Sequence, residues 1–333
     1  MAGLSVMGYL QVVEYFDPKR QPSWGLELSL WDYVDKRELV YVDIARRSGV
    51  GYILGGNDGS FTAVIEDLIF ATETSQAIAA TLGTAKQAGA GVNSVAKGYI
   101  LGGYAGAYIA VIEDLIFATE TSQVIAATLD TAKQAGAGVN SAAKGYILGG
   151  YTSANTAVIE DLIFATETSQ AIAATLDTAK RYGVGVNSAA KGYILGGNDG
   201  SFTAVIEDLI FATETSQAIA ATLDTGKQTG AGVNSVTKGY ILGGYTGAYT
   251  AVIEDLIFAT ETSQAIAATL DTAKQTGVGV NSATKGYILG GDTGGGDTAV
   301  IEDLIFATET SQAIAATLDT GKFGGAGVQN GFV

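Results

Sequence analysis

The heptapeptide KGYILGG at residues 97–103 decides the fold, because it recurs along the chain with a fixed period. Further copies begin at Lys144, Lys191, Lys238 and Lys285, and a copy without the lysine begins at Gly51. Successive copies are 47 residues apart. A second marker, IEDLIFATETSQ, begins at Ile65 and returns in every unit, the last interval being one residue longer in the loop GDTGGGDT. The sequence therefore contains six repeats, and a fixed period of this length indicates a repeat architecture.

Each repeat contains four short apolar runs bounded by turn residues, which is typical of strands rather than helices. In the second repeat these predicted strands are GAGVNS (89–94), GYILGG (98–103), AVIEDLIFAT (110–119) and SQVIAATL (122–129). Many of their positions are apolar on both faces, as VI and LIF in the third run show. A strand that is apolar on both faces must be covered on both faces.

Four-stranded units of 40 to 50 residues predict an all-β fold, a six-bladed β-propeller over residues 51–333. The glycine-rich run becomes the innermost strand, since side chains would collide where six strands converge on the axis. The C-terminal TGKFGGAGV repeats TGKQTGAGV and then stops, whereas the first unit lacks this strand. Residues 325–330 are thus expected to close the ring. An open solenoid and a ring completed between chains are the alternatives, but an open stack requires capping repeats that the sequence does not show.

This strand order resembles the kelch repeat over about 280 residues. GYILGG stands where kelch blades have a tyrosine followed by Gly-Gly, FATETSQA stands where they have Tyr-Asp-Pro-Glu-Thr and then tryptophan, and TAK (131–133) stands near their arginine. The tryptophan is replaced by small aliphatic residues, namely Ala77, Val124, Ala171, Ala218, Ala265 and Ala313.

Residues 1–50 are a separate β-rich segment without the 47-residue pattern, and they contain both prolines, both tryptophans and both methionines. Fifty residues make a poor independent core. We therefore expect this segment to attach the propeller to a larger assembly or to a second copy of the chain, through the apolar residues Trp24, Leu26, Leu28, Leu30 and Trp31.

The composition excludes several classes of function. Lysine and arginine total 18 against 34 aspartates and glutamates, a net charge of −16, so the basic surface that nucleic acid requires is missing. No apolar run approaches the roughly 18 residues of a membrane span, and no signal peptide is expected. Cysteine and histidine are absent, which removes thiolate and imidazole chemistry. We expect no enzyme activity, no metal site and no cofactor.

The Glu-Asp pair of the third strand, Glu66-Asp67 in the first repeat, is the one candidate for carboxylate catalysis or Ca²⁺ binding. Adjacent strand residues point to opposite faces, so one pair cannot hold a ligand jointly. A blade-to-blade contact with Lys86, Lys133 and their equivalents is the preferred interpretation. The copper oxidases among kelch proteins require histidine, and a sialidase requires three arginines, whereas Arg181 is the only arginine after residue 47.

The copies differ in two sets of short segments. The loops between the second and third strands are NDGSFT, YAGAYI, YTSANT, NDGSFT, YTGAYT and DTGGGDT, and the segments before the first strand are QAG, QAG, RYG, QTG, QTG and FGG. In a four-stranded meander both sets lie at the same end of the blades. Tyr, Asn, Gly and Ser in exposed loops are typical of recognition surfaces. The candidate binding residues are Asn57, Phe61, Tyr104, Tyr108, Tyr151, Tyr182, Asn198, Phe202, Tyr245 and Tyr249; tolerated drift is the alternative.

Near-identical blades behind a short non-repeated segment resemble the kelch-like repeat proteins of bacteriophage tails, baseplates and fibres. This resemblance implies a protein of the virion, made in the host cytoplasm, in which residues 1–50 contact other virion proteins and the variable loops bind host-surface glycans. A purely structural decoration or spacer protein and a cellular kelch scaffold for protein partners are the alternatives. A propeller by itself does not name a function.

Overall fold

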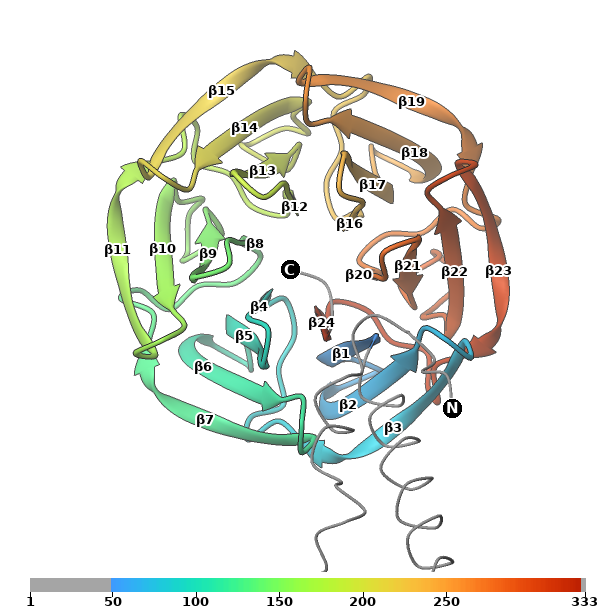
Figure 1. Ribbon diagram of the computed structural model, residues 1–333, viewed down its shortest axis with the longest axis horizontal. Coiled ribbons are helices and arrows are strands. Elements are labelled where there is room, and N and C mark those ends of the chain that lie inside the picture. The colour runs from blue at the N-terminus through green and yellow to red at the C-terminus, as the bar shows by residue number, and fades with distance from the viewer. Residues whose placement is uncertain (1–48, 331–333) are drawn as a thin grey trace, which may run out of the picture. The chain divides into compact units, whose positions relative to one another are not determined.

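The computed structural model describes residues 49–330. These residues form six antiparallel four-stranded sheets, arranged as blades around one axis (Figure 1). The predicted all-β, six-bladed propeller is therefore confirmed. No helix occurs between residues 49 and 330, and hence none that could cross a membrane.

The strands occupy equivalent positions in every blade. The innermost strands are β24 (Ala326–Asn330) in blade 1, then β4 (Ala90–Asn93), β8 (Ala137–Asn140), β12 (Val184–Asn187), β16 (Ala231–Asn234) and β20 (Val278–Asn281). The second strands are β1 (Val50–Asn57), β5 (Lys97–Tyr104), β9 (Lys144–Leu148), β13 (Lys191–Leu195), β17 (Lys238–Tyr245) and β21 (Lys285–Leu289).

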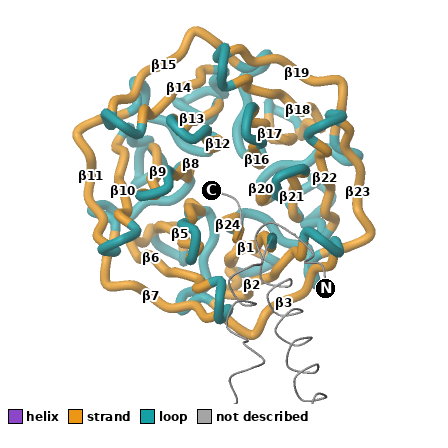
Figure 2. The backbone as a smooth tube through the Cα atoms, in the orientation of Figure 1, coloured by secondary structure: helices purple, strands orange, loops and turns teal. Residues whose placement is uncertain are grey.

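The outer half of each blade follows the same order. The third strands are β2 (Phe61–Ile69), β6 (Tyr108–Ile116), β10 (Val158–Ile163), β14 (Val205–Ile210), β18 (Tyr249–Ile257) and β22 (Val300–Ile305). The outermost strands are β3 (Thr74–Thr81), β7 (Thr121–Thr128), β11 (Thr168–Thr175), β15 (Thr215–Thr222), β19 (Thr262–Thr269) and β23 (Thr310–Thr317). Loops join the strands within a blade and lead from each outermost strand to the next innermost strand (Figure 2).

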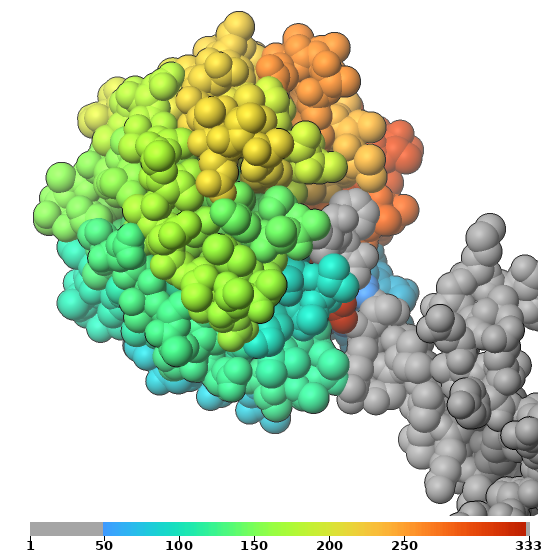
Figure 3. Space-filling view, turned by 60° about the vertical axis from the view of Figure 1, so that its left-hand side comes forward, coloured from blue at the N-terminus to red at the C-terminus, as the bar shows by residue number. Residues whose placement is uncertain are grey.

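Burial follows the strand positions. The second strand is buried on both faces, whereas the outermost strand alternates between exposed and half-buried residues. The third strand was predicted to run to Thr119 but ends at Ile116, because Phe117 leaves the sheet and stacks on Tyr52 of the preceding blade. The blades, coloured from cyan through yellow to orange, are in continuous contact along the ring (Figure 3).

The C-terminal strand closes the ring, as predicted. Strand β24 pairs antiparallel with β1, in a register that runs from Val50 opposite Asn330 to Leu54 opposite Ala326. Blade 1 thus has its inner strand from the C-terminal end of the chain and its other three strands from the N-terminal part of the repeats.

A buried ion pair joins each blade to the next. The backbone of Lys133 is bonded to blade 2, through Gly103 and Ile109, while its Nζ lies 2.7 Å from Glu160 in β10 of blade 3. Both side chains are fully buried. The pair recurs at every junction, including the last, as Lys86–Glu113, Lys133–Glu160, Lys180–Glu207, Lys227–Glu254, Lys274–Glu302 and Lys322–Glu66. The predicted blade-to-blade role of this glutamate is confirmed.

Stacked rings also join each pair of neighbouring blades. The buried tyrosine of the second strand lies nearly parallel to the phenylalanine that follows the third strand of the next blade, with ring centroids 5.3–5.7 Å apart. The pairs are Tyr52–Phe117, Tyr99–Phe164, Tyr146–Phe211, Tyr193–Phe258, Tyr240–Phe306 and Tyr287–Phe70. Such offset pairs add to the stabilisation from buried area.

A further contact on the outside of the ring is missing at one junction. Asp130 Oδ2 accepts a hydrogen bond of 2.8 Å from the Ala171 backbone N–H of blade 3, and four other junctions repeat this bond. Gly83 stands at the equivalent position between blades 1 and 2, opposite Val124.

The expected attachment residues Trp24, Leu26, Leu28, Leu30 and Trp31 lie outside the described residues. Their role stays a prediction.

Deleting residues 325–333 should destabilise the ring. The deletion removes β24 and leaves the buried strand β1 as an unpaired edge, which is a template for association with other chains. We expect a lower melting temperature and dimers or aggregates in size-exclusion chromatography with light scattering. A monomer with unchanged melting would contradict closure by this strand.

Restoring the missing aspartate should stabilise the protein. The double substitution Gly83→Asp with Val124→Ala reproduces the residues of the other junctions, and we expect the free energy of unfolding to rise by about 1 kcal/mol. Urea unfolding measures this change. The control is Gly83→Ala with Val124→Ala, which limits the unfolded chain equally but supplies no acceptor. Equal stability of the two variants would show that the hydrogen bond contributes nothing.

Candidate functional site

The two sets of variable segments meet at one end of the blades, which we call the loop face. It comprises the loops 57–61, 104–108, 151–155, 198–202, 245–249 and 292–297, and the segments 87–89, 134–136, 181–183, 228–230, 275–277 and 323–325. One residue of each segment forms an antiparallel bridge to a loop, as Gln87 with Tyr104, Gln134 with Tyr151, Arg181 with Asn198, Gln228 with Tyr245, Gln275 with Asp292 and Phe323 with Asn57. The variation between blades is therefore concentrated on one surface.

Four of the candidate residues form a first aromatic cluster across blades 1 to 3. Phe61 packs edge-on against Tyr104 at 5.6 Å between centroids, Tyr104 lies 5.7 Å from Tyr108, and Tyr108 contacts Tyr151 edge-on at 5.7 Å. These four rings are half-buried, because they pack against one another across neighbouring blades. The cluster offers ring faces and edges that apolar and sugar surfaces can contact.

A second aromatic cluster spans blades 4 to 6. Phe202, which is 37 % exposed, packs edge-on against Tyr245, and Tyr245 packs edge-on against Tyr249. The Tyr249 hydroxyl donates a hydrogen bond of 2.8 Å to Asp292 Oδ2. Gln275 Nε2 donates a second bond of 3.2 Å to the same oxygen. The second cluster therefore ends on a carboxylate.

The two candidate asparagines have a structural use. Asn57 Oδ1 accepts a hydrogen bond of 3.0 Å from the Gly59 N–H, and Asn198 Oδ1 accepts one of 3.1 Å from the Gly200 N–H. Each side chain thereby fixes the turn of its own loop. They shape the loop face, and their amide oxygens are already occupied.

Arg181 is a residue of the loop face that the sequence analysis leaves without a role. Its guanidinium Cζ lies 4.4 Å from the ring centroid of Tyr151 and 5.5 Å from that of Tyr182. It thus extends the first cluster by two further residues, Arg181 and the candidate Tyr182. The available signal was that Arg181 is the only arginine of the repeats.

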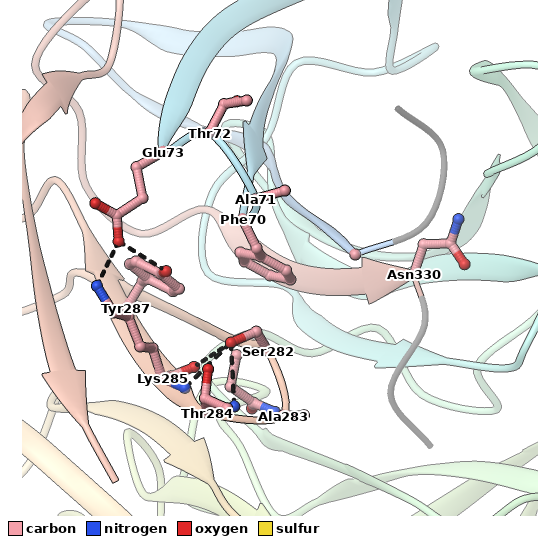
Figure 4. A pocket seen from close by; sticks show the side chains of 12 residues that line it. Phe70, Ala71, Thr72, Glu73, Ser282, Ala283, Thr284, Lys285, Tyr287 and Asn330 are labelled. Atoms are coloured by element: carbon pink, nitrogen blue, oxygen red, sulfur yellow. Dashed lines mark hydrogen bonds and ion pairs between the residues drawn. The ribbon is translucent and has the colours of Figure 1, made fainter. Parts of the chain in front are cut away.

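The opposite end of the blades, where each third strand turns into the outermost strand, carries grooves between neighbouring blades. We call this end the turn face. The groove between blades 6 and 1 has a volume of about 680 Å³ and contains Lys285, Tyr287 and Glu73 (Figure 4). Lys285 Nζ lies 2.6 Å from Glu73 Oε1 and 2.7 Å from Asp303, and the Tyr287 hydroxyl donates to Glu73 at 3.2 Å. The same trio recurs at four other junctions, as Lys97–Tyr99–Glu167 and its equivalents.

The protonation of this trio suits a structural contact. Burial lowers the pKa of Lys285, but its hydrogen bonds to Asp303 and Glu73 outweigh burial and raise the pKa above 10.5. Burial, and then the Glu73 charge, raise the pKa of Tyr287. A general base needs a pKa near the working pH. These shifts move the pKa values of the lysine and the tyrosine further above neutral pH.

The axial channel is uniform. It has a volume of about 180 Å³ and is lined in every blade by glycines of the innermost strand and by one amide side chain, which is asparagine in five blades and Gln329 in blade 1. The lining therefore varies much less from blade to blade than the loop face does.

Raising the pH should destabilise the ring through the turn-face trios. The five lysines and five tyrosines have folded-state pKa values above their ordinary 10.5 and 10.0. Stability from such groups is fully present below the unfolded pKa and is lost as the pH rises through the folded pKa. We expect the urea midpoint to fall above about pH 10. Near-ultraviolet absorbance should show these tyrosines ionising only together with unfolding; their ionisation in the folded protein would contradict the prediction.

No known protein family has a sequence model that matches this chain, and no curated protein matches it. The six-bladed architecture rests on the structure, and the kelch and virion resemblances rest on the repeat sequence alone.

Proposed function

We propose that this protein is a non-catalytic, virion-associated propeller whose loop face binds glycans of the host surface. The observation that carries this proposal is the contrast between its parts. The strands and blade junctions are almost the same in every blade, whereas the loop face differs and gathers its aromatic residues into two clusters. A six-bladed propeller is compatible with an interaction scaffold, since its fold leaves one loop set of every blade at the same surface.

Glycans suit this surface better than a large protein partner. The aromatic rings lie in shallow, half-buried clusters rather than in one broad apolar patch, and an exposed ring can stack on the apolar face of a sugar. Each contact is weak. Several loops on one chain, and several chains on one particle, attach firmly through high effective concentration.

Residues 1–50 fit the proposal as the segment that contacts other virion proteins, alone or by forming a homo-oligomer. This role follows from the alternating apolar residues 24–31 and from the absence of the repeat pattern. A spacer or decoration protein of the virion shares every feature of the fold, but its loops would bind nothing. A cellular scaffold for protein partners is the third possibility.

Removing the loop aromatics should abolish glycan binding without unfolding the ring. We expect the wild-type protein to give signals on a glycan array, each single Tyr→Ala substitution at residues 104, 151 or 245 to weaken binding about fivefold, and the triple substitution to remove it. The matched control is Val95→Thr with Val236→Thr, which changes two exposed apolar residues of the turn face. Thermal melting verifies the fold of each variant.

Array signals that survive the triple substitution would move the binding site away from the loop face. No signal from the wild-type protein, in an oligomeric form that permits avidity, would favour the spacer.

A further inference from the structure

Arg181 is the one cation between residues 49 and 330 without a carboxylate partner. Every lysine of that range forms an ion pair. No ion pair or side-chain hydrogen bond joins Arg181 to any residue of the same range, and its Nε is buried without an acceptor. In a chain with a net charge of −16, carboxylates are abundant, so an unpaired guanidinium is an exception that calls for a ligand.

Aromatic rings hold this guanidinium in place. The ring centroid of Tyr151 lies 4.4 Å from its Cζ and that of Tyr182 lies 5.5 Å away, and Tyr108 packs edge-on against Tyr151. A cation over an aromatic ring is attracted to it, but the contact uses the face of the guanidinium and satisfies no N–H donor. The two terminal Nη groups, unlike Nε, are not buried and form no hydrogen bond with residues 49–330, and together they can hold a carboxylate with two parallel hydrogen bonds.

Tyr182 places a bulky side chain at a position where the backbone is left-handed in every blade. Its φ is 57°, and the five equivalent residues have φ between 52° and 67°, so the fold requires the turn but not the tyrosine. The equivalent positions carry small residues, namely Ala88, Ala135, Thr229, Thr276 and Gly324. Since alanine serves in two blades, the tyrosine in this blade supplies something other than the backbone turn.

We propose that Arg181, Tyr151 and Tyr182 form a subsite for the carboxylate of an acidic sugar, such as a uronic or sialic acid residue. The inference rests on the proposed glycan binding and names the ligand class at one place on the loop face. The guanidinium binds the carboxylate, and the tyrosine rings contact the sugar. Because the protein is strongly acidic, this single cation decides whether an anionic glycan is accepted.

The second aromatic cluster provides an internal comparison. Tyr245 stands where Tyr151 stands, two blades further along the chain, but Gln275 replaces Arg181 and Asp292 replaces Asn198. Asp292 already accepts hydrogen bonds from Tyr249 and Gln275. The Asp292 carboxylate would repel the carboxylate of an acidic sugar at this place. The second cluster should therefore bind neutral sugars and disfavour acidic ones.

The test compares glycans as free acids and as their methyl esters, which have nearly the same shape without the charge. We expect the wild-type protein to bind sialylated or uronate oligosaccharides about tenfold more tightly than their esters, in calorimetry at low salt. Arg181→Gln should remove this preference, so that the acid and its ester bind with equal affinity. Glutamine stands at this position in four other blades, at residues 87, 134, 228 and 275, so the variant keeps the fold. Arg181→Lys should keep part of the preference.

A gain of function tests the same idea in the other cluster. The triple substitution Gln275→Arg, Thr276→Tyr and Asp292→Asn places the counterparts of Arg181, Tyr182 and Asn198 beside Tyr245, the counterpart of Tyr151. It should raise the number of acid-preferring sites per chain from one to two, whereas Gln275→Arg alone should not, because Asp292 would pair with the new guanidinium.

The outcomes separate this inference from the proposed function. Equal binding of acids and esters, unaffected by Arg181→Gln, would overturn the carboxylate subsite while glycan binding stands. A preference for sulfated over carboxylated glycans would overturn the carboxylate assignment. No binding of any acid, ester or neutral glycan would overturn both proposals.

Discussion

The close approach of glycine backbones at the axis is the constraint on which the ring depends. A Cβ atom on Gly138 would lie 2.2 Å from the carbonyl oxygen of Gly91, and one on Gly185 would lie 2.1 Å from that of Gly138. No side chain fits there, so six strands can meet at one axis only with glycine at this position. Just before each innermost strand, backbone hydrogen bonds of 2.6–2.9 Å link residues 88, 135, 182, 229, 276 and 324 in a closed cycle. This cycle joins all six blades through backbone atoms, whatever side chain the linked residues carry.

Further from the axis, neighbouring blades are joined by contacts between side chains. Burying an ion pair such as Lys133–Glu160 costs desolvation free energy, which offsets much of the attraction between the two charges. A blade placed in a wrong register would leave one of these charges buried without its partner, which destabilises the fold more strongly. The pair therefore acts mainly by disfavouring a wrong partner or register. The same ion pair and the same tyrosine–phenylalanine stack occur at every junction, including the one between blades 6 and 1, so the residues that form them contact two blades. Substitutions there disturb two blades. The loop face is outside this system, which is why the copies could diverge there.

The sequence predicted the repeat, the blade order and the closing strand because each follows from period and local pattern. The role of Glu66 and its equivalents was also predictable, since this glutamate lies in a strand that is apolar on both faces and its buried charge needs a lysine as partner. The partner of the adjacent aspartate was not: Lys97 bridges Asp114 and Glu167, which belong to different blades. Arg181 over Tyr151 was hidden for the same reason. Contacts between blades depend on how far each blade is rotated and tilted, and no local pattern encodes that geometry.

The loops themselves repeat with a longer period than the strands. The loop NDGSFT occurs at residues 57–62 and again at residues 198–203. The loop YAGAYI at residues 104–109 is similar to YTGAYT at residues 245–250. The loops of blades 1 and 2 therefore recur in blades 4 and 5. Three blades are half a turn of a six-bladed ring. The two aromatic clusters are therefore copies of one arrangement on opposite sides of the axis, in which Phe202, Tyr245 and Tyr249 correspond to Phe61, Tyr104 and Tyr108. The copies differ at the next position, which is Tyr151, in contact with Arg181, in the first cluster and Asp292 in the second. Tolerated drift alone would scatter such changes over all loops. Retention of three aromatic residues in both copies, beside opposite charges, is compatible with the proposed pair of sites that share a ligand type and differ in charge preference.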